Sequence, residues 1–551
     1  MTILTLSKKE LESKIGNIDD KLRNKIDMFG TPIDNEDENE ISIEIFPNRP
    51  DLLSLQGFTR GLLAFLGKGK GIVEYKVETP EKDFKVIIDK SVKKVRPYTA
   101  CAIVKGLKFD NNTIDEIIDI QEKLHGSYGR NRKKLAIGIY PLEKIKLPIK
   151  FLARKPEDIK FQPLEFPKEI NGRQILSQHP TGREYGKLLE GYNEYPIFED
   201  ANNEILSMPP IINSEKTGKI SKETTDVFIE CSGFNNEFLK KTLNMIVTAL
   251  ADLGGKIYAM EIEDKVEGKY LSPNLNAEKM EFQIDYINKN LGLELSEKEI
   301  ASLFSKMGIG FDGVKEKCYA LVPSYRTDII HKIDLVEEIA IAYGYDNFKP
   351  EIPEIAGVGE ESKIDILKGK VAEVLIGLGL LEVSSYHLST KEKQFKKINV
   401  KEFKDKIIPV IDSKTENNIL RASLLASSIQ ILSENSDASY PQKIFEMGRI
   451  FSYNDECETG IGESERLCIS LCHEKANFTE LKQVLDYLMK MLDLNYEINE
   501  TENPSFIDGR VGEIIVDGKS IGVIGEVNLT VLKNNRIMMP VASLEISIEN
   551  I

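Results

Sequence analysis

Two polar segments that contain proline or glycine divide this 551-residue sequence. One covers residues 261–278, and the other, at 350–359, holds two prolines and two glycines. A single hydrophobic core rarely grows beyond about 250–300 residues, so a chain of this length has to split. Hydrophobic residues make up 41% of the sequence, which is enough to offset the entropy of ordering and excludes a largely disordered chain. The sequence therefore predicts several separately folded domains.

Strand and helix patterns alternate along the whole chain, which predicts an α+β multidomain fold. Residues 236–254 have the apolar spacing of an amphipathic helix, and Asp517-Gly518 joins two apolar runs in the manner of a hairpin turn. Asp51 is a candidate N-cap for the helix that follows it. We expect four domains: a mixed N-terminal module at 1–75, a strand-and-helix domain at 91–270, a strand–helix–strand–helix unit of winged-helix size at 279–348, and a final α/β segment at 363–551.

Charge and motif content exclude several classes of protein. The net charge is −16, which rules out a nucleic-acid coat protein that is basic over its whole surface. The six cysteines include no CxxC pair, so neither a zinc ribbon nor a disulfide framework is predicted. No apolar run has the length of a membrane helix and no signal peptide precedes the first charges, so we expect a cytoplasmic protein. The motifs of P-loop proteins, α/β-hydrolases and zinc proteases are absent.

The segment RTDIIHKIDLVEEIAIAYGYD contains the sharpest cluster of carboxylates. Asp334, Glu337 and Glu338 stand at positions i, i+3 and i+4 of a predicted helix and share one face, and Asp328 lies just before it. Four carboxylates this close repel one another unless cations neutralise them, and oxygen ligands suit Mg²⁺. A solvated acidic face, or a face that pairs with arginine or lysine of a partner, explains the same spacing.

A second polar cluster lies in SMPPIINSEKTG and TTDVFIECSG. The two prolines fix the backbone ahead of polar side chains, and the second segment has the pattern of a strand. These segments predict the wall of a small polar pocket, with a loop that leads into an ordinary strand as the alternative. The candidate pocket residues are Asn213, Ser214, Asp226, Glu230 and Ser232.

A basic run, GRNRKK at 129–134, stands out within an acidic chain. It is a candidate phosphate contact, and a solvated surface loop is the alternative.

Five motifs occur in one order along the sequence: EIFPNRPDLLSLQGFTRGLLAFLG, SMPPIINSEKTGKISKETTDVFIE, LVPSYRTDIIHKIDLVEEIAIAYGYD, IFEMGRIF and FIDGRVGEIIVDGKSIGVIGEV. Together they resemble the β subunit of phenylalanine–tRNA ligase in its shorter archaeal and eukaryotic form. The resemblance covers essentially the whole chain. The combination is specific, whereas a single motif such as NRPDLL would not be.

The resemblance implies an (αβ)₂ tetramer in which the α subunit binds ATP and phenylalanine and charges tRNA(Phe). The β subunit would contribute tRNA contacts and an editing pocket that hydrolyses misacylated Tyr–tRNA(Phe). Residues 363–551 would be similar to a class II synthetase core with an antiparallel sheet that has lost catalysis. In agreement, no glycine-rich, arginine-terminated ATP motif follows IFEMGRIF. The sequence departs from the family at GEVNLTVL, which lacks the His-Pro expected after GEV, and this departure concerns only a local turn.

The resemblance also assigns roles to the two clusters. It places an editing pocket within 91–270, near the five polar residues named above, and a Mg²⁺ site shared with the α subunit on the acidic helix. Its ligands would be Asp328, Asp334, Glu337 and Glu338.

Editing has a physical reason, because tyrosine is phenylalanine plus one hydroxyl. An apolar pocket rejects an added hydroxyl by only about a hundredfold, so a second site has to select the wrong product by hydrogen bonding its phenol. Two other classes remain: a stand-alone editing or scaffold protein that binds tRNA without ligase activity, and a DNA-binding regulator that reads through 279–348. A net charge of −16 disfavours the regulator.

Overall fold

The computed structural model describes residues 2–69, 71–314, 317–353, 357–401 and 407–549. The chain forms two compact units, Met1–Ile352 and Pro353–Ile551. Each unit combines helices with several sheets, so the predicted α+β multidomain fold is confirmed. No helix among the described residues is long and apolar enough to cross a bilayer.

The N-terminal module is a three-stranded antiparallel sheet with three helices. The sheet has the order β1 (Thr2–Ser7), β3 (Glu40–Ile45), β2 (Ile33–Glu36), and the helices are α1 (Lys8–Ile15), α2 (Asp20–Met28) and α3 (Leu55–Phe65).

The start of α3 differs from the prediction. Ser54 caps this helix by accepting a hydrogen bond from Gly57 N–H at 3.0 Å, so the predicted N-cap at Asp51 is wrong. Asp51 lies instead in a short 3₁₀ turn, where its buried carboxylate accepts two hydrogen bonds of 2.9 Å from Arg49. A nearby guanidinium is a stronger partner for a carboxylate than a backbone amide.

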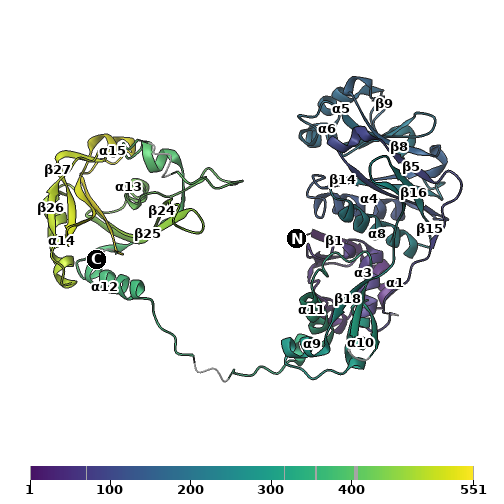
Figure 1. The fold of residues 1–551 in the computed structure, drawn as a ribbon, viewed down its shortest axis with the longest axis horizontal. Coiled ribbons are helices and arrows are strands. Elements are labelled where there is room, and N and C mark those ends of the chain that lie inside the picture. Colours follow the sequence, from purple (N-terminus) through teal and green to yellow (C-terminus); the bar gives the residue numbers. More distant parts are fainter. Residues whose placement is uncertain (1, 70, 315–316, 354–356, 402–406, 550–551) are drawn as a thin grey trace. The chain divides into compact units, whose positions relative to one another are not determined.

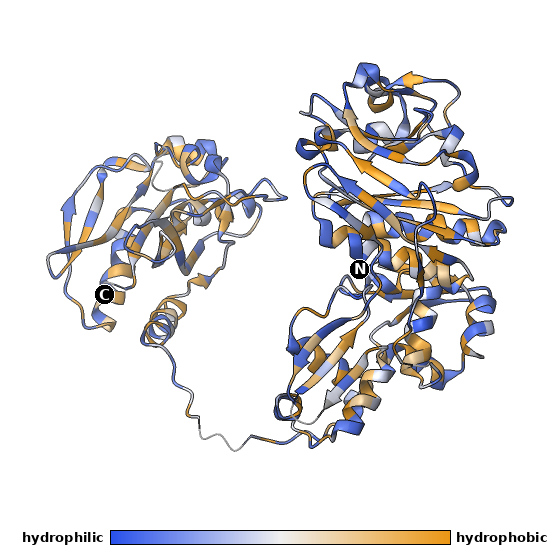
Figure 2. Cartoon of the chain, turned by 45° about the vertical axis from the view of Figure 1, so that its right-hand side comes forward, coloured by the Kyte–Doolittle hydropathy of each residue, from blue (hydrophilic) through white to orange (hydrophobic). Residues whose placement is uncertain are grey.

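Two packed sheets form the centre of the first unit (Figure 1). Hydrophobic residues from both sheets make a shared core between them, and Figure 2 shows hydrophobic residues concentrated in these strands. One sheet has the order β4 (Val77–Glu78), β15 (Lys256–Tyr258), β6 (Tyr98–Lys105), β14 (Val227–Gly233), β7 (Leu135–Pro141). The other has the order β13 (Ile212–Asn213), β12 (Ile205–Met208), β11 (Tyr195–Glu199), β8 (Ile149–Arg154), β5 (Lys85–Ile88), β16 (Met260–Asp264), β17 (Gly268–Ser272).

Helices cover the outer face of each sheet. The predicted helix at 236–254 is confirmed as α8 (Asn236–Asp252), which packs with α4 (Asn111–Gly126) on the five-stranded sheet. On the other side lie α5 (Gly172–Gln178), α6 (Pro180–Tyr185) and the short pair β9 (Lys160–Phe161) and β10 (Ile170–Asn171). The single-turn α7 (Glu215–Gly218) follows β13.

Residues 278–343 form a smaller module that shares a core with the N-terminal module. Its sheet has the order β18 (Glu278–Phe282), β20 (Lys317–Val322), β19 (Gly310–Val314), and its helices are α9 (Ile284–Leu291), α10 (Glu297–Lys306) and α11 (Lys332–Tyr343).

The second unit is built on one seven-stranded sheet between two layers of helices. Helices α12 (Lys363–Gly377) and α14 (Phe478–Met491) pack on one face, and α13 (Leu424–Glu434) and α15 (Leu529–Asn534) on the other. The predicted hairpin turn at Asp517-Gly518 is confirmed, with φ of 50° and 75° at these residues. The strand order is β21 (Leu381–Glu382), β24 (Gln442–Tyr453), β25 (Ile461–Cys472), β29 (Val541–Ser547), β28 (Lys519–Val527), β27 (Phe506–Val516), β26 (Glu497–Glu500), and every pair except β21–β24 is antiparallel.

Candidate functional site

A pocket of about 390 Å³ opens at the side of the five-stranded sheet, next to α4. We call it the Glu230 pocket. Its wall is largely apolar, and its polar groups include Gln121, His125, Ser207, Asn213 and Glu230. Apolar walls with a few placed polar groups are typical of sites for small ligands. The apolar wall residues include Ile114, Ile118, Ile137, Ile139, Leu164, Ile211, Ile212 and Ile220.

Glu230 is the buried acid of this pocket. Side chains alternate along β14, so Ile229 faces the helices while Phe228 belongs to the core between the sheets. Glu230 lies on the same side as Phe228, with 1% of its surface exposed. Its Oε1 accepts a hydrogen bond of 3.3 Å from the Tyr140 hydroxyl, and its Oε2 has no hydrogen-bond partner in the described chain.

Burial raises the pKa of Glu230 to about 8, against the opposing influence of Arg96. The acid is therefore mostly protonated at neutral pH and can both donate and accept hydrogen bonds. A buried carboxyl with one free oxygen is an incomplete hydrogen-bonding group, and a ligand hydroxyl would complete it.

Gly138 makes the room that Glu230 occupies. It pairs directly with Glu230 across β7 and β14. A Cβ atom at Gly138 would overlap the Tyr140 hydroxyl and lie 2.7 Å from Glu230 Oε1. No sequence pattern singles out Gly138 or Tyr140, because only the strand register shows that they face the acid.

The other four predicted pocket residues have different positions. Asn213 lines the pocket, and its Oδ1 lies 3.4 Å from the Tyr140 hydroxyl. Ser214 is buried directly before α7. Asp226 lies outside the strand and accepts a hydrogen bond of 3.0 Å from Gly106 N–H. Ser232 is buried, and its hydroxyl accepts a hydrogen bond of 3.1 Å from Arg96 Nε. The structure therefore brings Asn213 and Glu230 together in the pocket, and it gives Asp226 and Ser232 other partners.

The pocket also contains His125, which no sequence motif indicates, and Arg132, which belongs to the basic run at 129–134. His125 Nε2 accepts a hydrogen bond of 2.8 Å from Ile137 N–H, and burial lowers the pKa of this imidazole. Arg132 donates to the carbonyls of Pro210 and Ile211 at 3.2 and 3.0 Å. This arginine of the GRNRKK run thus ties the loop to the pocket wall.

The acidic helix presents its carboxylates to a hollow of about 720 Å³, which all four predicted ligands line. Two of them are already paired with Arg326. This guanidinium donates to both oxygens of Asp328 at 2.8 and 2.7 Å, and it lies 2.8 Å from Glu338 Oε1. Burial opposes ionisation of Asp328, but Arg326 outweighs it and lowers the pKa to about 2.

The carboxylates of the acidic helix differ in their hydrogen bonding and in their exposure to solvent. Asp334 accepts hydrogen bonds of 2.7 Å from Ile330 N–H and His331 N–H at the start of α11. Glu337 is exposed, and Glu338 Oε2 is buried without a hydrogen-bond partner in the described chain. Within the described ranges no three His, Cys, Asp or Glu side chains form a group that could hold a metal ion. Four-carboxylate ligation does not fit this arrangement, whereas Glu337 and Glu338 fit a hydrated Mg²⁺ that takes one or two carboxylates.

The second unit contains a buried ion pair between Arg421 and Glu446, the glutamate of the IFEMGRIF motif. The Arg421 side chain is 2% exposed and lies 2.6 Å from Glu446 Oε1. It also donates to Arg449 O at 2.6 Å and to Ser385 Oγ at 2.8 Å. A Cβ atom at Gly448 would overlap Arg421 Nη2, which explains the glycine of this motif.

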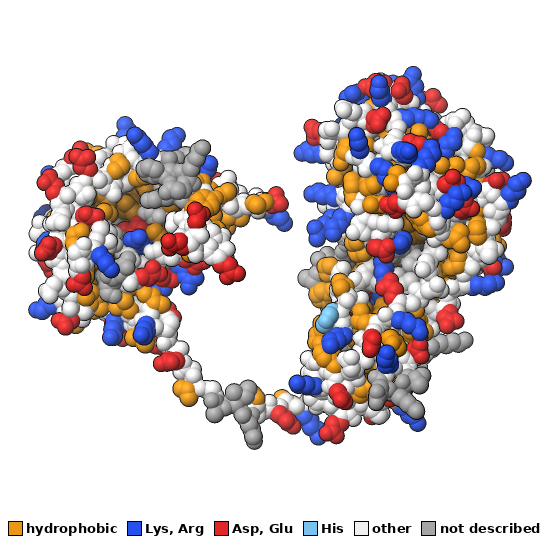
Figure 3. Space-filling model, viewed as in Figure 1, with side chains coloured by type: hydrophobic (Ala, Val, Ile, Leu, Met, Phe, Trp, Pro, Cys, Tyr) orange, Lys and Arg blue, Asp and Glu red, His pale blue; other side chains and the backbone are white. Residues whose placement is uncertain are grey.

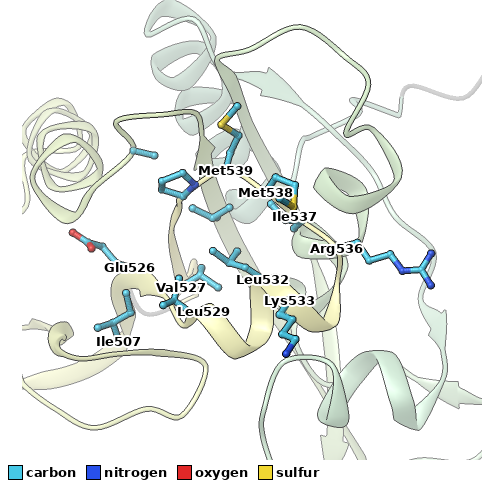
Figure 4. Close-up of a pocket in the computed structure, with 13 residues that line it drawn as sticks. Ile507, Glu526, Val527, Leu529, Leu532, Lys533, Arg536, Ile537, Met538 and Met539 are labelled. Atoms are coloured by element: carbon cyan, nitrogen blue, oxygen red, sulfur yellow. The ribbon is translucent and has the colours of Figure 1, made fainter.

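An apolar hollow of about 510 Å³ lies beside α15 in the same unit. Figure 4 shows Val527, Leu529 and Leu532 on its wall, with the side chain of Arg536 directed away from them. Asn528 caps α15 by accepting from Thr530 N–H at 2.8 Å. The departure from His-Pro after GEV therefore falls on the first residues of this short helix, and Leu529 is 72% exposed.

Comparisons with known proteins give one family for the whole chain. Residues 84–247 match the B3/4 domain, residues 280–345 the tRNA synthetase B5 domain, and residues 349–548 the phenylalanyl tRNA synthetase beta chain CLM domain.

Relatives and a solved structure agree. The phenylalanine–tRNA ligase beta subunit of Archaeoglobus fulgidus is 37% identical over 100% of this chain and 98% of its own length. That of Pyrococcus abyssi is 39% identical over 91% of this chain and 89% of its own. The crystal structure of an N-terminal fragment of the Pyrococcus horikoshii β-subunit superposes with a TM-score of 0.59 and 35% identity, covering 62% of this chain and 99% of the fragment. The predicted resemblance is thus confirmed, and the chain belongs to the phenylalanine–tRNA ligase β-subunit family.

Proposed function

We propose that this chain works as the β subunit of a phenylalanine–tRNA ligase tetramer and removes tyrosine from misacylated tRNA(Phe) in the Glu230 pocket. The α subunit binds ATP and phenylalanine and performs the charging reaction. The buried, partly unpaired carboxyl of Glu230 carries the editing proposal, because it stands in an apolar pocket where a phenol oxygen would complete its hydrogen bonding.

Selection follows from the difference between the two amino acids. The phenol of tyrosine supplies a partner for Glu230, whereas phenylalanine would leave the Oε2 atom of this acid unsatisfied. The ester of the tRNA would then lie toward the pocket mouth, where a water performs hydrolysis. The hydrogen bond from the Tyr140 hydroxyl to Glu230 Oε1 holds the acid in place.

The test is hydrolysis of pre-formed Tyr–tRNA(Phe) by the assembled tetramer. We expect clearance of the tyrosyl ester and sparing of Phe–tRNA(Phe). A tetramer that charges phenylalanine but leaves Tyr–tRNA(Phe) intact would contradict the editing proposal.

The purified β chain alone should form no phenylalanyl-adenylate, and adenylate formation without α would reverse the proposed division of roles.

The acidic helix is proposed to bind Mg²⁺ through Glu337 and Glu338, with Asp328 and Asp334 in supporting positions. The ion would offset the negative charge that Arg326 leaves uncompensated and would strengthen the contact with the α subunit.

Glu337→Gln should therefore remove most of the stabilisation that Mg²⁺ gives to the tetramer. The measurement is the thermal midpoint with Mg²⁺ and with a chelator, and we expect the gap between the two midpoints to shrink by a few degrees. Glu294→Gln, which changes an exposed acid of the same module, is the control. An unchanged gap in Glu337→Gln would identify the face as merely solvated.

A further inference from the structure

A further hollow, of about 780 Å³, lies beside the basic loop at 126–134. We call it the loop hollow. Its lining carries three cations and one acid: Lys123, Arg130, Lys134 and Glu122. In a chain with a net charge of −16, such a concentration of positive charge is unusual. Figure 3 shows Lys and Arg side chains gathered at the edge of the first unit, level with α4 and β14.

The positive charge of this hollow is not cancelled within the chain. The Glu122 carboxylate pairs with Arg132, at 2.8 Å, and also contacts His125. Lys123 pairs with Asp119. Arg130 and Lys134 are both exposed, and neither forms an ion pair with any residue that the structure describes.

An aromatic pair forms part of the wall and supports one of these cations. The rings of Tyr128 and Phe238 stack with centroids 3.8 Å apart and planes 8° from parallel. The Lys134 ammonium lies 5.0 Å from the centre of the Phe238 ring. This contact restrains the lysine and still leaves its hydrogen-bond donors without a carboxylate.

The loop hollow adjoins the Glu230 pocket. Glu122 lines both cavities, and one loop contributes Arg130 to the hollow and Arg132 to the pocket. A ligand that fills the pocket with one end and continues along this loop would pass over Arg130 and Lys134.

We infer that the loop hollow binds backbone phosphates of the single-stranded 3′ end of the aminoacyl-tRNA whose amino acid occupies the Glu230 pocket. The inference rests on the proposed editing function and adds the path of the substrate. Uncompensated arginine and lysine beside an aromatic wall are the groups that bind single-stranded nucleic acid. Arg130 and Lys134 are positioning residues, since they hold the RNA and take no part in hydrolysis.

The test uses the assembled tetramer with the double variant Arg130→Gln/Lys134→Gln. For clearance of Tyr–tRNA(Phe) we expect KM to rise about tenfold while kcat stays unchanged, because the lost contacts act in binding. The dependence of log kcat/KM on log salt concentration should also flatten, by about 0.7 for each phosphate contact removed.

Lys133→Gln is the matched control, because Lys133 is exposed on the same loop but does not line the hollow. It should keep the parental KM and salt dependence. If the double variant also keeps them, or loses kcat at parental KM, the phosphate path is overturned while editing stands. If the parent tetramer does not clear Tyr–tRNA(Phe), the proposed function itself has failed.

Discussion

Glu230→Ala should slow clearance of Tyr–tRNA(Phe) by the tetramer about 5- to 150-fold, equivalent to about 1–3 kcal/mol. The substitution removes the group that we expect to bind the phenol and leaves the Tyr140 hydroxyl without its acid. Charging of phenylalanine should be unchanged, because we propose that the α subunit performs that reaction. Asn213→Ala should reduce clearance less than Glu230→Ala does. The Asn213 side chain accepts a hydrogen bond of 3.4 Å from the Tyr140 hydroxyl and so acts on the acid only through Tyr140.

Two controls separate recognition from folding. Glu230→Gln keeps the shape and can still donate and accept, so it should retain more activity than the alanine variant. Asp226→Asn alters a predicted residue that the structure places on Gly106 N–H, and it should clear Tyr–tRNA(Phe) at the parental rate. Parental clearance by both Glu230→Ala and Asn213→Ala would show that tyrosine is bound elsewhere.

Arg421→Met should destabilise the second unit by about 3–5 kcal/mol, because it leaves Glu446 buried without its cation. The measurement is calorimetry of the tetramer, in which the transition of this unit should move to lower temperature. Combining Arg421→Met with Glu446→Leu should recover much of the loss, since the uncompensated charge is then gone.

Arg510→Met provides the comparison for this ion pair. Arg510 pairs with Glu526 at 2.6 Å, but its side chain is 60% exposed. A pair exposed to this degree contributes about 0–1 kcal/mol. Equal shifts in the Arg421 and Arg510 variants would show that burial does not decide the strength of the Arg421 pair.

The sequence predicted local structure well where one short segment determines it. The helix at 236–254 and the hairpin at Asp517-Gly518 depend on spacing and turn chemistry, and both are confirmed. The prediction that Asp51 is an N-cap was wrong for a local reason as well, because Arg49, two residues earlier, donates hydrogen bonds to the Asp51 carboxylate.

Long-range partners set the limits of prediction at the two candidate sites. Glu230 and Ser232 share one face of β14, as alternation requires, but Arg96 binds the serine from another part of the chain. Helical spacing places Glu337 and Glu338 one turn after Asp334, yet it does not show that Arg326 folds back to pair with Glu338. Arg326 is the first residue of the segment RTDIIHKIDLVEEIAIAYGYD, so its positive charge was the one feature of this segment that could have indicated an internal partner for these carboxylates.

Gly138 offers a way to interpret other sequences of this kind. Gly138, which pairs with Glu230 across the strands, has no methyl group, and the side chains of Glu230 and Tyr140 occupy the space that a methyl group would need. In a protein with alanine or any larger residue at this position, the Tyr140 hydroxyl and the acid would have to shift from these places. Glycine here therefore marks chains that can share this pocket, and its loss would mark those that distinguish their substrates by another arrangement.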